Sequence, residues 1–301
     1  MTPTVDVIIP AYNISRHLPT ALESVINQTF QNWRIFVVDD GSSDGTEEVL
    51  RPFQDRLGAR LVYTKQQNQG PSAARNTGIR QGSAGYIALL DGDDLWVPER
   101  LADSVDRLER TPAAGLSYGL VTRISETGGV IDTWRGNETP VEGKLASDVY
   151  MRRVEFPCPT ITIRRTCLEE VGLFDEQMRA TEDRDLWLRI AQIREVAFIP
   201  KVLAFYRTAA SSASLNYEKM MNAQLHFVAK HFGEPGCGPK ERQAAMARIY
   251  RQRAQGFKAE KQPWKAFVTS SRALATYPRD KDTMRTTVSL ALNLLKTQRG
   301  G

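Results

Sequence analysis

The stretch that decides the fold of this chain is Tyr86-Ile87-Ala88-Leu89-Leu90-Asp91-Gly92-Asp93-Asp94. A short apolar run that ends in acidic residues and glycine is typical of a buried strand followed by a turn. Two earlier apolar runs also end in turn-like polar segments: Trp33–Val38 leads to Asp39-Asp40-Gly41-Ser42, and Val5–Ile9 leads to Pro10-Ala11-Tyr12-Asn13. Segments with helical spacing lie between these runs. We therefore predict an α/β fold with a mostly parallel sheet and helices on both faces.

The pattern changes along the rest of the chain. After residue 114, the sequence predicts a helix over 181–193 and strands at 115–124, 130–132, 161–163, 196–199 and 202–206. Beyond residue 215 it predicts an all-helical extension, with helices at about 216–232, 240–258, 263–276 and 283–297 and a linker at Gly233–Pro239. The predicted domains are residues 1–214, in halves 1–114 and 115–214, and the helical region 215–301.

Composition excludes collagen-like, wholly disordered and disulfide-scaffold proteins. The 301 residues are 41% hydrophobic and 25% charged, and no apolar run is long enough to cross a membrane as a helix. No secretory signal is visible, and we expect the three cysteines to be reduced thiols in a cytosol. Residues 215–301 hold 16 Lys and Arg against 6 Asp and Glu, which leaves 24 against 29 in residues 1–214. The acidic front half argues against a nucleic-acid partner, whereas the basic rear half would suit an anionic membrane or glycan.

Carboxylates at the predicted strand ends are the candidate functional residues. Asp91 and Asp93 offer oxygen ligands of the kind that Mg²⁺ or Mn²⁺ shares with a nucleotide diphosphate. Asp39 is placed to accept hydrogen bonds from a base or ribose, although a turn role explains it equally. Glu182 and Asp183 begin a helix, where acids commonly act as caps, but the neighbouring Trp187 would suit a sugar-binding site with a general base.

Other chemistries lack their sequence signals. Gly115-Leu116-Ser117-Tyr118-Gly119 has the letters of a hydrolase nucleophile elbow, but it continues as a strand instead of turning into a helix. The sequence contains neither a dinucleotide-binding glycine motif nor a phosphate-binding loop of the Walker type, and its three histidines have no zinc spacing.

Six blocks together resemble family 2 glycosyltransferases. They cover roughly residues 5–210 in the family's order: 7–13, 37–46, 70–78, 90–96, 171–176 and 182–187. The resemblance implies a GT-A fold, in which a nucleotide-binding half joins an acceptor-binding half. It also implies transfer of one sugar from a nucleotide-sugar donor, here expected to be a UDP-sugar, with inversion at the anomeric carbon.

The resemblance also implies residue roles. Pro10, Tyr12 and Asn13 would line the base and ribose pocket, Asp39 would hydrogen-bond the base, and Arg75 would lie near the nucleotide. Asp91 would touch ribose or metal and Asp93 would ligate Mg²⁺ or Mn²⁺, while Asp94 could share that task. Asp183 matches the catalytic base. Glu182, Asp94, Trp187 and Arg207 are candidate substrate contacts.

The chain departs from the family pattern in two ways, the first of them in the segment after Tyr206. Many relatives carry a histidine where this chain has Ala209, so Arg207 is the remaining candidate for a diphosphate contact or for loop closure. The Gln-x-x-Arg-Trp motif of processive members is absent, which predicts one sugar added per encounter. The expected acceptor is a glycan or lipid-linked oligosaccharide, in bacterial surface polysaccharide synthesis.

The C-terminal region is weakly similar to a tetratricopeptide unit. Its last helix places Met284, Val288, Ala291, Leu292 and Leu295 on one face, which fits a packing helix, a membrane-surface contact or a homodimer contact. The expected location is cytoplasmic, with peripheral contact at the inner face of the membrane left open. The alternative functions are a nucleotidyltransferase, which would release pyrophosphate, and a catalytically silent protein that binds a partner through the helical region.

Overall fold

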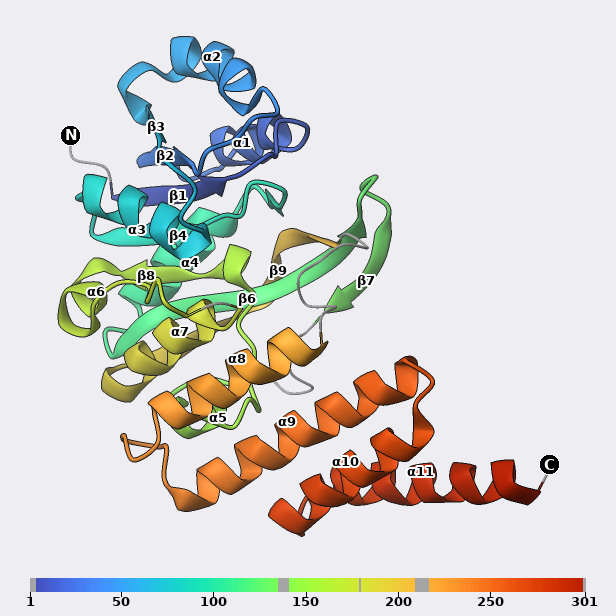
Figure 1. Cartoon of the computed structure of the whole chain (residues 1–301). Coiled ribbons are helices and arrows are strands. Elements are labelled where there is room, and N and C mark those ends of the chain that lie inside the picture. Colours follow the sequence, from blue (N-terminus) through green and yellow to red (C-terminus); the bar gives the residue numbers. More distant parts are fainter. Residues whose placement is uncertain (1–3, 135–140, 179, 209–216, 300–301) are drawn as a thin grey trace. The chain divides into compact units, whose positions relative to one another are not determined.

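The computed structural model describes residues 4–134, 141–178, 180–208 and 217–299 (Figure 1). Its chain forms two compact units. The first contains residues 1–145, 155–177 and 182–210, and the second contains residues 146–154, 178–181 and 211–301. The predicted boundary at residue 214 and the residues Ala209, Ser211, Ser212 and Ser214 lie outside the described residues.

The first unit begins with a parallel sheet, as predicted. Strands β1 (Val5–Ala11), β2 (Trp33–Asp39), β3 (Leu61–Lys65) and β4 (Tyr86–Leu89) pair in the order β3-β2-β1-β4, every pair parallel. The connections contain helices α1 (Leu18–Ile26), α2 (Thr46–Leu57) and α3 (Pro71–Gln81). Parallel neighbours end at the same edge of a sheet, so this order brings the ends of β2, β1 and β4 side by side.

The two faces of β1 pack on different helices. Val5, Val7 and Ile9 belong to the core that includes Leu22 of α1 and Leu50 of α2, whereas Ile8 points the other way. There it meets α3, because a Cβ added to Gly78 would lie 3.0 Å from the Ile8 Cγ2 atom. A glycine at this position lets the helix backbone approach the sheet closely. The parallel sheet is therefore covered on both faces.

The sheet continues with mixed pairing. Its full order is β3-β2-β1-β4-β8-β6-β9-β5, and β7 pairs with β6 alone among the described strands. The added strands are β5 (Leu95–Trp96), β6 (Ala114–Ser125), β7 (Val130–Trp134), β8 (Thr162–Arg164) and β9 (Glu195–Thr208), and the helices of this part are α4 (Arg100–Glu109), α6 (Arg165–Val171) and α7 (Glu182–Ile193). Strands β6 and β7 form the long green hairpin of Figure 1.

The sequence predicted two strands at 196–199 and 202–206, and this prediction was wrong. A single strand, β9, runs through both segments in parallel with β6. Ile199 pairs with Gly119 and Val202 pairs with the next residue, Leu120, so Pro200 and Lys201 are accommodated as an irregularity. Proline has no N–H to donate, but a bulge removes it from the ladder without ending the strand.

The second unit is helical, as predicted for the C-terminal region. It consists of α8 (Tyr217–Lys230), α9 (Pro239–Ala259), α10 (Pro263–Thr276), α11 (Lys281–Arg299) and the short α5 (Ala146–Tyr150). Tyr150 joins α5 to α8, because its hydroxyl donates to the Val228 carbonyl at 2.8 Å and its ring lies 6.0 Å from that of Phe227. The segment Gly233–Pro239, predicted as a linker, lies inside this unit between α8 and α9. Among the described residues, no helix has the length and apolar character needed to cross a membrane.

Candidate active site

Three polar loops meet at the carboxyl edge of the parallel sheet. Ala11 pairs with Asp39 at the ends of β1 and β2, and the Asp40 N–H donates to the Ala11 carbonyl at 2.8 Å. The loop after β4 packs on the same edge, because a Cβ added to Gly92 would lie 2.0 Å from the Ile14 Cδ1 atom and 3.4 Å from the Pro10 carbonyl oxygen. The polar segments that the sequence analysis singled out are thus neighbours in the fold.

The loop after β2 is held together by its own carboxylates. Asp39 is fully buried, and its Oδ1 accepts from the Ser42 N–H at 2.7 Å while its Oδ2 accepts from the Tyr63 hydroxyl at 2.9 Å. Asp40 accepts from the N–H groups of Gln69 and Gly70 at 2.9 and 2.8 Å. These bonds fix the start of α3. Asp39 therefore has the turn role considered above, and each oxygen keeps a second acceptor position for a ligand.

The segment after β1 is locked to the same loop. Asn13 adopts a positive φ of 51°, which asparagine tolerates better than most residues. Its N–H donates to the Ser42 hydroxyl at 2.9 Å, and its Oδ1 accepts from the Ser43 N–H at 2.9 Å. Tyr12 is 53% exposed, while Pro10 is half-buried at the end of β1. Of the three residues, Tyr12 presents an open aromatic surface at this edge.

The loop after β4 holds carboxylates that disfavour one another's ionisation. Burial raises the pKa of Asp93, and the charge of Asp91 raises it further. Burial also raises the pKa of Asp94 well above its usual value, and the charges of Asp93 and Asp91 add to the effect. Asp94 Oδ1 accepts from the Arg207 N–H at 2.8 Å, but its buried Oδ2 has no hydrogen-bond partner among the described residues. Within the described part of the chain, Asp91 is the one of the three that forms an ion pair, with Arg75.

This donor set fits a divalent cation in its chemistry. Carboxylate oxygens are the ligands that Mg²⁺ and Mn²⁺ prefer, and a cation would relieve the repulsion within the loop. In the described part of the chain, no three His, Cys, Asp or Glu side chains already stand together as a complete ligand set. One or two protein carboxylates suffice for Mg²⁺ when substrate phosphates and water supply the remaining ligands. The residues are thus compatible with a metal shared with a nucleotide.

Arg75 links this acidic loop to helix α7. The guanidinium is 6% exposed, and its Nη2 donates to Asp91 Oδ1 at 2.7 Å while its Nη1 lies 3.6 Å from Glu182 Oε1. Burial alone would lower the pKa of Arg75, but the Asp91 and Glu182 charges outweigh burial and raise it. Its Nε and Nη1 atoms are buried and have no hydrogen-bond partner in the described part of the chain. This arginine therefore keeps its positive charge between the loop after β4 and the first turn of α7.

The first turn of α7 contains the predicted catalytic base. Asp183 is half-buried, and its Oδ1 accepts from the N–H of the next residue, Arg184, at 2.6 Å, which is a capping contact. Burial and the Asp183 charge raise the pKa of the neighbouring Glu182. Acids in a first helical turn also interact favourably with the helix dipole. Both the capping interpretation and the catalytic one are consistent with this position.

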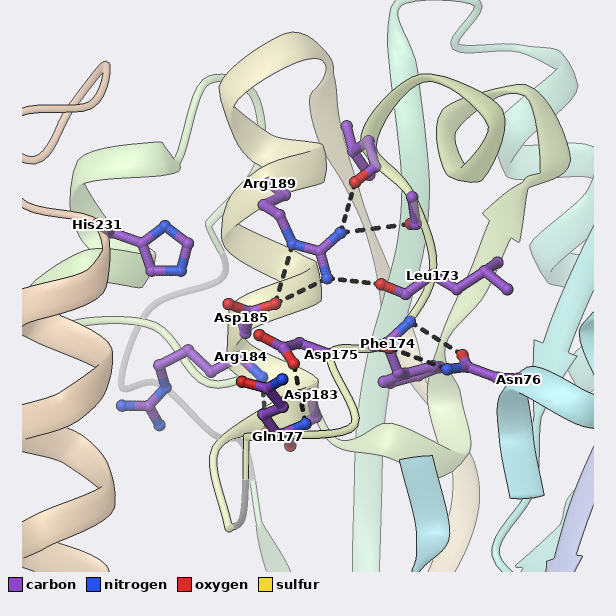
Figure 2. A network of polar contacts seen from close by, with 12 residues as sticks. Asn76, Leu173, Phe174, Asp175, Gln177, Asp183, Arg184, Asp185, Arg189 and His231 are labelled. Atoms are coloured by element: carbon purple, nitrogen blue, oxygen red, sulfur yellow. Dashed lines mark hydrogen bonds and ion pairs between the residues drawn. The ribbon is translucent and has the colours of Figure 1, made fainter. Parts of the chain in front are cut away.

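A network of buried polar contacts holds α7 in place (Figure 2). Asp185 is fully buried and pairs with Arg189 one turn later, at 2.9 and 2.7 Å. Arg189 also donates to the Val171 and Leu173 carbonyls at 2.7 and 2.8 Å. From α3, the Asn76 side chain exchanges hydrogen bonds with the N–H and carbonyl of Phe174. The segment before α7 is therefore fixed to α7 itself and to the helix that carries Arg75.

Two predicted substrate contacts have structural partners instead. Trp187 is 2% exposed and packs edge-on against Phe174 with ring centroids 6.2 Å apart, so its face is not open for a sugar. Arg207 donates from Nε to the Asp93 carbonyl at 2.9 Å and from Nη1 to the Ser125 and Glu126 carbonyls. These bonds tie the acidic loop to the end of β9 and to the β6–β7 turn. Arg207 thus braces the loop that holds Asp93 and Asp94.

The sequence analysis missed four residues around the site. Tyr63 donates its hydroxyl to Asp39, and His17 lies close enough for its charge to lower the pKa of Asp93. Burial and the charges of Asp94, Asp91 and Asp93 raise the pKa of Tyr206. Burial and the Asp91 charge raise the pKa of the Cys158 thiol well above its usual value, which keeps it protonated. Only Tyr206 had a signal in the sequence, as the neighbour of Arg207.

Comparison with known proteins gives relatives over most of the chain. An uncharacterized glycosyltransferase of Rickettsia felis is 32% identical over 211 residues, which are 69% of this chain and 33% of that protein. The match thus spans about a third of that relative. The Escherichia coli protein named UDP-Glc:alpha-D-GlcNAc-diphosphoundecaprenol beta-1,3-glucosyltransferase WfgD is 27% identical over 82% of this chain and 89% of its own length.

A solved structure has the same fold. S. aureus TarS 1-349 in complex with UDP-GlcNAc superposes with a TM-score of 0.68, at 16% identity, over 100% of this chain and 92% of that one. The fold is therefore the GT-A type that the sequence predicted. The family model described as Glycosyl transferase family 2 matches residues 6–172, a range that includes β1 through α6 with the loops after β1, β2 and β4. A match over more than half of the chain, on a GT-A fold, shows that the chain belongs to glycosyl transferase family 2.

Proposed function

We propose that the protein is an inverting glycosyltransferase that moves one sugar from a UDP-sugar to a hydroxyl of a glycan or lipid-linked oligosaccharide. The observation that supports the proposal is that Arg75 pairs with both Asp91 and Glu182, because Glu182 directly precedes Asp183 in the chain. A donor held at the acidic loop after β4 would have its anomeric carbon near the first turn of α7. A fixed geometry of donor and base is what group transfer requires.

The proposed donor site consists of the three loops at the sheet edge. Tyr12 would stack on the base, Asp39 and Asn13 would bond base and ribose, and Asp91 would bond ribose or metal. Asp93, with Asp91 or Asp94, would hold Mg²⁺ or Mn²⁺, which supplies positive charge against the diphosphate of the leaving group. The names of the relatives support a UDP-linked donor, because WfgD is named for UDP-Glc and TarS was solved with UDP-GlcNAc.

Asp183 is the proposed general base. An acceptor hydroxyl is a weak nucleophile at neutral pH, and Asp183 would take its proton as the oxygen attacks the anomeric carbon. The new bond between oxygen and carbon forms on the face opposite the diphosphate, the bond to the diphosphate oxygen breaks, and the nucleoside diphosphate leaves. This single displacement inverts the anomeric carbon and needs no covalent enzyme intermediate.

The cellular role belongs to the same proposal. WfgD is named for an acceptor on diphosphoundecaprenol. A lipid-linked acceptor in bacterial surface polysaccharide synthesis agrees with that name. A cytoplasmic location would give the enzyme access to nucleotide-sugars.

The test is nucleoside diphosphate release from a panel of UDP-sugars with the Asp183→Asn variant. We expect the variant to lower kcat by about 10²–10⁴, the usual contribution of a general base, while UDP affinity changes little. Glu182→Gln is the matched control, since it alters the adjacent carboxylate and should lose less activity. Turnover in Asp183→Asn close to that of the unaltered protein would refute the assignment, and pyrophosphate release from a nucleoside triphosphate would indicate a nucleotidyltransferase.

A further inference from the structure

The hairpin of α10 and α11 has an unusual distribution of apolar residues. The buried positions of α10 are Ala266, Ser270 and Ala273, and the described buried positions of α11 are Thr283, Thr287 and Leu290. The Ser270 and Thr287 hydroxyls share a hydrogen bond of 2.7 Å in this interior. Apart from Leu290, small and hydroxyl side chains thus fill the buried positions of the two helices, where a soluble helical hairpin would ordinarily bury its large apolar residues.

Large apolar residues lie on the outside of the same helices. On α11, Met284, Val288 and Leu292 are 48%, 54% and 54% exposed and recur every four residues, so they form one stripe. On α10, Trp264 and Val268 are 65% and 49% exposed at the same spacing. These five residues are called the outer stripe below. The sequence analysis also placed Leu295 on this face, but its side chain lies outside the described residues.

Basic residues dominate the surroundings of the outer stripe. Residues 261–293 contain six Lys and Arg but only two acids, Asp280 and Asp282. Both acids lie near Arg251, at 3.3 and 3.4 Å, so that arginine offsets part of their charge. Lys265 on α10 and Lys281 and Arg285 on α11 are exposed. An exposed apolar stripe flanked by Lys and Arg is the pattern of a helix that lies in a membrane interface.

We propose that the outer stripe of α10 and α11 binds an anionic lipid surface. A second copy of the chain is disfavoured as the occupant, because it would bring equally basic helices against Lys281 and Arg285. Lipid phosphates complement the positive charge, and Trp264 has the amphipathic ring that favours the headgroup region. This inference does not depend on the proposed reaction.

The first test is binding of the full chain to vesicles of phosphatidylcholine with and without about a quarter phosphatidylglycerol. We expect binding to the anionic vesicles only. Lys281→Glu/Arg285→Glu should weaken it at least about twenty-fivefold, because each basic residue near an anionic surface contributes about fivefold to binding. Lys144→Glu/Lys240→Glu changes the net charge equally with exposed residues outside α10 and α11, and should weaken it much less. Equal losses in the two double variants would overturn the proposal, since net charge alone would then explain binding.

The second test addresses the apolar stripe. Met284→Gln/Val288→Gln/Leu292→Gln keeps good helix formers at exposed positions, so folding should persist, and vesicle binding should fall at least about tenfold. Ser289→Gln on the same helix is the control. Tryptophan emission should shift to the blue with anionic vesicles, and the shift should disappear in Trp264→Phe. A dimer in solution that the triple variant dissociates would overturn the proposal in favour of a second copy, and so would unchanged vesicle binding by that variant.

Discussion

Two acidic loops at one sheet edge have opposite electrostatics. In the loop after β2, Asp39 and Asp40 are almost fully buried, yet the four carboxylate oxygens each accept a hydrogen bond from the protein. In the loop after β4, Asp93 and Asp94 have raised pKa values, and no described residue hydrogen-bonds the buried Asp94 Oδ2. In the first loop, called the complete loop below, the protein supplies a donor to every carboxylate oxygen, and a ligand could use only the second acceptor positions. The second loop, called the incomplete loop, keeps carboxylates that a cation would stabilise.

This difference separates aspartates that stabilise the fold from aspartates that are available for binding. Buried carboxylates with full hydrogen bonding stabilise a fold, while those that repel each other cost stability and persist where binding compensates. Asp40 fixes the start of α3, the helix that carries Arg75. Arg75 then connects the second loop to α7. The complete loop thereby supports the geometry of the incomplete one.

The largest expected effect follows from removing a carboxylate of the complete loop. Asp40→Ala leaves the Gln69 and Gly70 N–H groups without this acceptor. We expect the free energy of unfolding to fall by about 3–6 kcal/mol, because each of the two bonds to a charged group contributes about 1.5–3 kcal/mol. Chemical denaturation measures it. Asp55→Ala, on the exposed side of α2, should change stability by less than about 0.5 kcal/mol. Similar stability for both variants would remove the distinction between the loops.

The next largest effect should follow from Asp93→Asn in the incomplete loop, and it should change UDP binding and turnover instead of stability. In Asp93→Asn, UDP affinity in the presence of Mn²⁺ should fall to the level of the unaltered protein in EDTA. Turnover should fall about 10²–10³-fold, because metal stabilisation of a leaving diphosphate amounts to several kcal/mol. Calorimetry with Mn²⁺ and with EDTA measures the affinity, and thermal denaturation should show no loss of stability. Metal-dependent UDP binding that survives the substitution would exclude Asp93 as a ligand.

Much of this arrangement was predictable from the sequence. Apolar runs that end in Asp39 and Asp91 gave the parallel strands, and the parallel order required their ends to meet. Pro200 misled the prediction, since a proline ordinarily interrupts a strand, but here it sits in a bulge opposite Gly119 and Leu120. The change from apolar to polar residues along the sequence locates strand ends, because it follows from local backbone structure.

The partners of each acid could not be predicted, because they come from distant parts of the chain. Tyr63 reaches Asp39 across 24 residues, and Arg207 reaches Asp94 across 113. Trp187 looked like a sugar-binding residue because of its acidic neighbours, but Phe174 covers it in the core. Such contacts decide whether a buried carboxylate has hydrogen-bond donors for its oxygens, and they form only in the folded chain.

The smallest effect tests the electrostatics of the complete loop through pH. Burial alone would raise the pKa of Asp44, but hydrogen bonds from Thr46 and Ser15 outweigh it and hold the pKa below the usual value. A lowered pKa adds stability above the unfolded value of 3.8, and this stability is lost as the pH falls through the folded value. Asp44→Ala removes the acceptor of the Thr46 N–H and hydroxyl at the start of α2. It should therefore cost about 0.5–1 kcal/mol at neutral pH and almost nothing near pH ~2.

Thermal denaturation at the two pH values measures this difference, and a chain of this size should show a change in Tm of a few degrees at neutral pH. Asp44→Asn keeps an acceptor for the Thr46 N–H but has no charge to titrate, so it should lose part of the stability at neutral pH and show no acid dependence at this position. An equal loss at both pH values in Asp44→Ala would mean that the residue acts through packing. The carboxylates of the first loop would then be less distinct from those of the second than their hydrogen bonds indicate, because their charge would contribute nothing to folding.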